Sequence, residues 1–134
     1  MLEIHIVPRR MAAIDFGANH AKRWRAAIGV DPAGGGFVGL FRVVGPHSDE
    51  AVPVWEEPLV WDVKEMAAST GGSPQVRALC YSESADRYFD VVIDVDGEHV
   101  EFKIGPAGEP SRYKRVASFG FKGNVLVAAN VREE

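Results

Sequence analysis

Cys80 is the most reactive side chain that this chain offers, and its surroundings argue against catalysis. It is the only cysteine, so no intramolecular disulfide can form. In an alternating segment it shares a small apolar face with Val76 and Ala78. A nucleophilic thiol needs a lowered pKa, from a histidine or a helix N-terminus, and some exposure. We therefore expect Cys80 to be a buried structural thiol.

The histidines show no paired spacing of the kind that zinc sites use, and no second cysteine could complete such a site. They are His5, His20, His47 and His99. His99 lies close in sequence to Asp90, Asp94 and Glu101, which could form an acid–base or metal cluster on one sheet face. An ordinary solvated sheet face has the same composition. We predict no metal and no cofactor, and we favour a protein without enzymatic activity.

A glycine run matches the spacing G-x-G-x-x-G from Gly34 to Gly39. A dinucleotide site needs that turn to open a helix whose N-terminal amides hold the pyrophosphate. The residues that follow, Phe41 to Val44, are typical of a strand instead. The run is therefore predicted to be a hairpin loop.

Two clusters combine basic and aromatic side chains, as single-stranded nucleic-acid binders do. One is Arg23, Trp24 and Arg25, and the other is Arg112, Tyr113, Lys114 and Arg115. They would form a binding strip if the fold placed both on one face. The net charge of −4 counts against this alternative.

An acidic stretch around two tryptophans predicts a protein interface. The acids are Asp49, Glu50, Glu56, Glu57, Asp62 and Glu65, and Trp55 and Trp61 lie among them. Tryptophan is enriched at interaction hot spots, and surrounding charges can steer a basic partner. We select Trp55, Glu56, Glu57 and Trp61 as the interface; a solvated loop with both tryptophans in the core is the alternative.

The composition is that of one ordinary globular domain. The chain has 134 residues, 46% of them hydrophobic and 25% charged, which fits a single β-rich domain over residues 1–134. No run reaches the roughly 20 apolar residues of a membrane span. The N-terminus, with Glu3 and His5, differs from a signal peptide. We expect a soluble, cytoplasmic protein without membrane contact.

Glycine and proline punctuate short β-branched and aromatic runs, which indicates a mainly β fold. The clearest element is a hairpin from Arg87 to Ile104. Its Asp96-Gly97 dipeptide predicts a two-residue turn that sets Val95 opposite Glu98, and Asp94 opposite His99. Alternation places six apolar side chains on one buried face: Phe89, Val91, Ile93, Val100, Phe102 and Ile104.

Further strands are expected from Leu2 to Val7, Ala12 to Phe16, Phe37 to Val44, Val76 to Tyr81, Tyr113 to Phe121 and Val125 to Val131, with a tight turn at Lys122-Gly123-Asn124. The fold class is an antiparallel β-sandwich or a partly open β-barrel with one short helix.

Two segments fit more than one pattern, and a third is predicted to be a loop. Lys22 to Val30 alternates as a strand, which we favour over a helix capped by Asn19. Asp62 and Glu65 resemble a capping box, so the segment from Asp62 to Ser69 is the predicted helix. The segment from His47 to Glu57, with its prolines and acids, is predicted to be an exposed loop.

These patterns favour a non-catalytic protein-binding module or a small subunit of a larger assembly, with a protein partner or self-association. The alternatives are a single-stranded nucleic-acid-binding β-barrel and a small acid–base enzyme using Asp94, His99 and Glu101.

Overall fold

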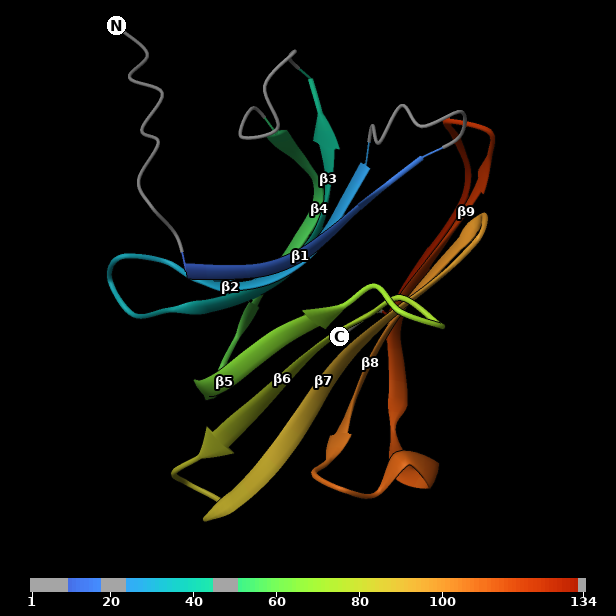
Figure 1. Cartoon of the computed structure of the whole chain (residues 1–134). Helices are drawn as coiled ribbons and strands as arrows, with labels where there is room; N and C mark the ends of the chain where they lie inside the picture. Colours follow the sequence, from blue (N-terminus) through green and yellow to red (C-terminus); the bar gives the residue numbers. More distant parts are fainter. Residues whose placement is uncertain (1–9, 18–23, 45–50, 133–134) are drawn as a thin grey trace, which may run out of the picture.

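The chain forms two antiparallel sheets that pack face to face, as the computed structural model in Figure 1 shows. The structure describes residues 10–17, 24–44 and 51–132. The four-stranded sheet has the order β1 (Arg10–Phe16), β2 (Trp24–Val30), β3 (Gly36–Val43) and β4 (Ala51–Leu59). The six-stranded sheet contains β5 (Asp62–Ser69), β6 (Gln75–Ser82), β7 (Arg87–Asp96), β8 (His99–Pro106), β9 (Lys114–Lys122) and β10 (Val125–Val131), paired in that sequence.

One core fills the space between the sheets, so the fold is a β-sandwich, the first of the two predicted architectures. Its buried side chains come from both sheets and include Ile28 and Leu40 from one and Ile93 from the other. Aromatic pairs cross the gap: the ring centroids of Trp55 and Phe102 lie 4.8 Å apart. Apolar burial of this kind is the main favourable term in folding, at about 25 cal/mol per Å² of apolar surface.

The predicted strands outside the β7–β8 hairpin, and two of the predicted turns, are present in the described part of the chain. β1, β2, β3, β6, β9 and β10 overlap the expected segments, and β2 confirms the strand alternative for Lys22 to Val30. The Gly34 loop closes β2 onto β3, and Gly123 has the positive φ (63°) of a tight turn between β9 and β10. The strand expected from Leu2 to Val7 lies outside the described residues.

The β7–β8 hairpin has the predicted faces but not the predicted register. Val95 pairs with Val100 and Asp96 with His99, so the loop is Gly97-Glu98. Gly97 alone takes a positive φ (55°), at the first loop position, as in a type II′ turn. The shift is two residues, and an even shift keeps every side chain on its face. The buried face is therefore confirmed although its cross-strand pairs are not.

The helix predicted from Asp62 to Ser69 is wrong, because this segment is strand β5. A bulge at Lys64 places Val63 opposite Cys80 and Met66 opposite Ala78. Both therefore face the core, although they stand three residues apart. Apolar residues three positions apart share a face in a helix, so this spacing suggests one. In β5 the extra residue of the bulge puts both side chains on the same face of the sheet.

Helical structure in the described part of the chain is limited to the 3₁₀ turn η2 (Pro110–Arg112). None of the described segments is a helix with the length and apolar character needed to cross a bilayer.

The loop predicted from His47 to Glu57 is wrong in its second half, because Ala51 onward forms β4. Within residues 10–17, 24–44 and 51–132, β4 has one neighbouring strand, β3. Prolines are tolerated on such an edge strand, where no second ladder needs their missing N–H, and this accounts for Pro53 and Pro58.

Candidate protein interface

Four of the described strands lie at the sheet edges, and three of these four carry charges or prolines that discourage pairing with another chain. β1 contains Arg10 and Asp15, and β5 contains Asp62, Lys64 and Glu65. β4 contains two prolines and two glutamates. Charges and prolines on an edge are the usual protection against intermolecular strand pairing.

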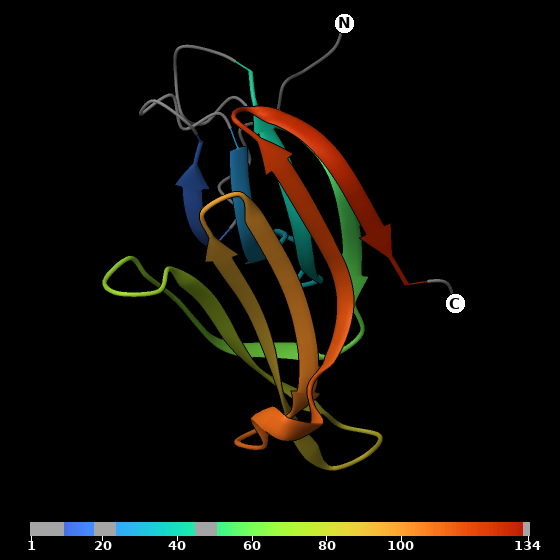
Figure 2. The same cartoon turned by 90° about the vertical axis from the view of Figure 1, so that its right-hand side faces the viewer.

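The fourth edge strand, β10, lacks these charges and prolines. Its sequence, Val-Leu-Val-Ala-Ala-Asn-Val, has no charge and no proline, and β9 is its only ladder partner among the described strands. Val125, Val127 and Val131 are 63%, 60% and 42% exposed. A bulge between Leu126 and Ala128 adds local twist. Figure 2 shows β10, in dark red, at the margin of the molecule. A strand of this composition with a free edge is a template for an added strand.

β4 and the end of β10 belong to the same side of the sandwich. Arg132, directly after β10, donates a 2.9 Å hydrogen bond from Nη2 to Oε1 of Glu57 on β4. Val52 and Val54 of β4 are 47% and 44% exposed. We call these two residues and the three exposed valines of β10 the β4–β10 flank. It combines an open backbone edge with apolar side chains that no described strand covers.

Of the predicted interface residues, Trp55, Glu56 and Glu57 lie on β4, whereas Trp61 lies in the β4–β5 turn; both tryptophans mainly pack in the core. Trp55 is half-buried and packs on Phe102 and, at 5.7 Å between ring centroids, on Phe119. Glu56 is exposed on β4, next to Glu57. Trp61, in the β4–β5 turn, stacks on Phe89 with centroids 4.2 Å apart and rings 5° from parallel. It lines an open hollow of about 490 Å³ with Val60, Ser82, Glu83 and Ser84.

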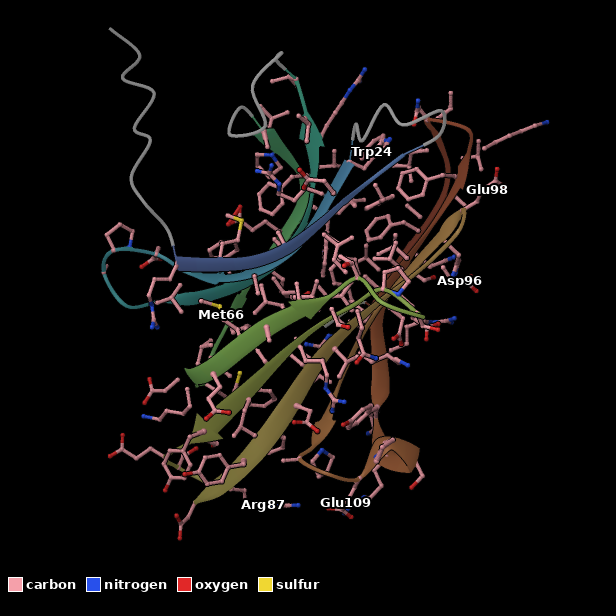
Figure 3. The ribbon with its side chains drawn as sticks, viewed as in Figure 1. Trp24, Met66, Arg87, Asp96, Glu98 and Glu109 are labelled. Carbon is pink, nitrogen blue, oxygen red and sulfur yellow. The ribbon has the colours of Figure 1, made fainter. Side chains whose placement is uncertain are left out.

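The two basic–aromatic clusters do not come together. Trp24 lies beside the β9–β10 turn, since its Nε1 donates to the carbonyl oxygen of Asn124. Arg112 and Tyr113 precede β9 at its other end, and nine residues of strand span roughly 26 Å. In Figure 3, Trp24 is at the upper end and Glu109, near η2, at the lower end.

In the first cluster, Trp24 is buried in the core and Arg25 forms an ion pair within the chain. The Trp24 side chain is only 6% exposed, so its ring offers no face to a base. Arg25 pairs with Asp15 through bonds of 2.6 Å and 2.9 Å. Arg23 lies outside the described residues, and Lys114 and Arg115 are exposed at the start of β9.

A polar cluster that sequence reasoning missed holds the second cluster's tyrosine. Asp90, 8% exposed on β7, accepts hydrogen bonds from the Tyr113 hydroxyl and from the Gly108 N–H at 3.0 Å. Arg77 Nη2 lies 3.4 Å from Asp90 Oδ2 and 3.3 Å from the Tyr113 hydroxyl oxygen. Burial first, and then the bond to Asp90, raise the pKa of Tyr113. The cluster fastens the η2 segment to the sheet, with every partner satisfied.

The three residues considered for acid–base chemistry, Asp94, His99 and Glu101, do not form one cluster in the fold. Asp94 accepts bonds from Lys103 at 2.6 Å and Gln75 at 2.7 Å. Burial would raise the pKa of Asp94, but the hydrogen bonds from Lys103 and Gln75 lower it overall. Glu101 faces Lys103 at 3.8 Å, and His99 is exposed opposite Asp96. No three metal-ligating side chains converge anywhere in the described part of the chain.

Cys80 lies in the core as predicted, with no exposed surface. Burial, and then the charge of Asp90, raise its pKa to about 11. The thiolate that a nucleophile requires is therefore disfavoured at neutral pH.

No protein family, curated protein or solved structure matches this chain. The valines of β10 are the candidate residues that sequence reasoning overlooked. Their signal was present as a seven-residue strand without charge or proline, but only the sheet order identifies that strand as an edge.

Proposed function

We propose that this chain is a non-catalytic binding module that associates with protein through the β4–β10 flank. The observation that carries the proposal is the character of β10: a free edge strand with no charge, no proline and three exposed valines. Natural sheets normally protect their edges with charges, prolines or bulges. β10 has a bulge at Val127 but no charge and no proline, which favours an edge that is covered in use.

Strand addition is the binding mode that this edge supports. The backbone N–H and C=O groups on the open side of β10 would bond to an extended segment of the partner, and the valines would pack on its alternate side chains. Large exposed apolar groups that lie together mark interaction sites more than isolated ones do. Val52 and Val54 of β4 extend the apolar surface on the same side.

Charge supplies a second reason to favour this flank. Glu56 is exposed on β4, and Glu57, beside it, accepts a hydrogen bond from Arg132. Acidic groups at the rim of an apolar patch speed the approach of a basic partner and contribute less to the final affinity. We therefore expect Glu56 to affect the association rate and the β10 valines to affect the dissociation rate.

Site-specific photo-crosslinking in cells tests the proposal. A photoreactive amino acid replaces Val127 in β10, and the matched control replaces Val60, which is 87% exposed in the β4–β5 turn. We expect a discrete protein adduct from position 127 that is absent from position 60. An absence of adducts from Val127, and from a second probe at Val54, would remove the basis of the proposal.

A further inference from the structure

We propose that the occupant of β10 is β10 of a second copy, paired antiparallel across a two-fold axis to give a continuous twelve-stranded sheet. This inference rests on the proposed function and adds the identity of the partner. The two six-stranded sheets would join edge to edge, with β9 and β10 of each copy at the centre.

The composition of β10 makes it complementary to itself. Val125 and Val131 occupy its two ends and small alanines, Ala128 and Ala129, occupy its middle. An antiparallel pair centred on Ala128 therefore sets Val125 opposite Val131, Leu126 opposite Asn130, and Val127 opposite the small Ala129. An interface of this symmetry requires one patch to fit its own copy, and this strand meets that requirement.

If two copies of this chain pair edge to edge, the charges on the edge strands favour pairing at β10 over pairing at β4 or β5. Two copies of β5 would bring Asp62, Lys64 and Glu65 into an interface with their duplicates, and two copies of β4 would bring four glutamates together. Like charges directly opposite one another on paired strands are destabilising. β10 carries no charge, so a two-fold axis through it creates no such repulsion.

The size of the contact predicts a reversible dimer. One seven-residue strand buries less surface than a standard stable interface, which needs about 800 Å² on each partner. We therefore expect association that depends on concentration, measurable by sedimentation equilibrium over roughly a hundredfold range of protein concentration. Val127→Lys should weaken dimerisation by about tenfold or more, because it places a charge on the pairing edge. Val60→Lys, the matched control, should leave it unchanged.

A cysteine scan along β10 tests the geometry without depending on that variant. Cys80 is buried, so single cysteines introduced at each position from Val125 to Val131 report on the edge alone. A disulfide forms only where the two Cα atoms lie about 4.4–6.8 Å apart. In an antiparallel pair, a residue moves away from its own copy by about 6.6 Å for each position from the axis. Crosslinking should therefore peak at one or two central positions and fall at both ends.

Three results would overturn the inference. They are a monomeric wild type at the highest concentration, a dimer that Val127→Lys leaves intact, and equal crosslinking along the whole strand, as parallel pairing requires. A monomeric wild type distinguishes this inference from the proposed function. If the photo-crosslinked adduct from Val127 then contains a different protein, the proposed binding function is supported and the pairing of two copies is refuted. An adduct of twice the chain mass supports both.

Discussion

The indole N–H of Trp24 donates a 3.1 Å hydrogen bond to the carbonyl oxygen of Asn124, one hundred residues further along the chain. This bond ties the first residue of β2 to the turn that presents β10. The Trp24 ring also packs on Phe121 of β9, with centroids 4.9 Å apart. The two sheets are thus fixed to one another next to the proposed interface.

Trp24→Phe should destabilise the fold by roughly 1–3 kcal/mol, because it removes this hydrogen bond and part of a buried ring. Urea unfolding followed by circular dichroism measures the change, with Val60→Ala in the exposed turn as a near-neutral control. Since the ring is buried, the variant should bind a single-stranded oligonucleotide no differently from wild type. A specific loss of oligonucleotide binding without loss of stability would instead support the nucleic-acid alternative.

Asp90→Ala should cost about 2–3 kcal/mol, because it leaves the Gly108 N–H and the Tyr113 hydroxyl without their shared acceptor. Asp96→Ala, an exposed position at the end of the same strand, is the matched control and should change stability by less than about 0.5 kcal/mol. Chemical denaturation of both variants gives the comparison. Equal effects would mean that the Asp90 cluster does not hold the η2 segment.

The raised pKa of Tyr113 predicts a loss of stability in alkali. A tyrosine whose pKa is higher in the folded state stabilises the fold below its unfolded pKa of about 10, and this contribution disappears as the pH rises through the folded pKa. The stability difference between wild type and Tyr113→Phe should therefore be constant near neutral pH and should shrink above about pH 10. Denaturation curves at several pH values measure it; a gap that stays constant in alkali contradicts the prediction.

Cys80 should resist thiol reagents in the folded protein. It has no exposed surface and its pKa is about 11, so both access and thiolate formation are suppressed at neutral pH. Labelling with a disulfide reagent should be slow in buffer and complete in denaturant, with a rate that follows unfolding. Fast labelling of a protein that is otherwise folded would place Cys80 in an exposed environment.

Gly29→Ala should destabilise the four-stranded sheet by about 1–3 kcal/mol. A Cβ there would lie 2.4 Å from Cζ of Phe37 and 2.9 Å from the carbonyl oxygen of Arg10, so the Phe37 ring has to leave its place over the glycine. Gly120→Ala is the control, because its nearest contact would be an ordinary 3.5 Å to Ala128. Thermal unfolding of the two variants should separate them by several degrees.

Bulges are the reason why strict alternation along the sequence assigns some strand residues to the wrong face of the sheet. The described ladders change register in β4, β5, β9 and β10. Each bulge adds one residue, so a side chain that strict alternation assigns to solvent turns toward the core. Val116 of β9 is 1% exposed at such a position. A single sequence records no partner strand and therefore cannot reveal where a bulge lies.

The candidate interface depended even more on tertiary structure. Sequence reasoning selected Trp55 and Trp61 by residue type, and the fold uses both rings largely for packing. It overlooked the β10 valines, because an apolar strand has the same sequence whether it lies inside a sheet or at its edge. Strand order, set by pairing between distant segments, separates the two cases.

The sequence by itself determined the β class, most strand positions and the buried face of the β7–β8 hairpin, because period-two alternation is a local property of the chain. Tertiary structure decided the hairpin register, the strand state of β5 and the free edge at β10. Each of these depends on which segment lies alongside, and the free energy of that contact comes from residues far away in the chain.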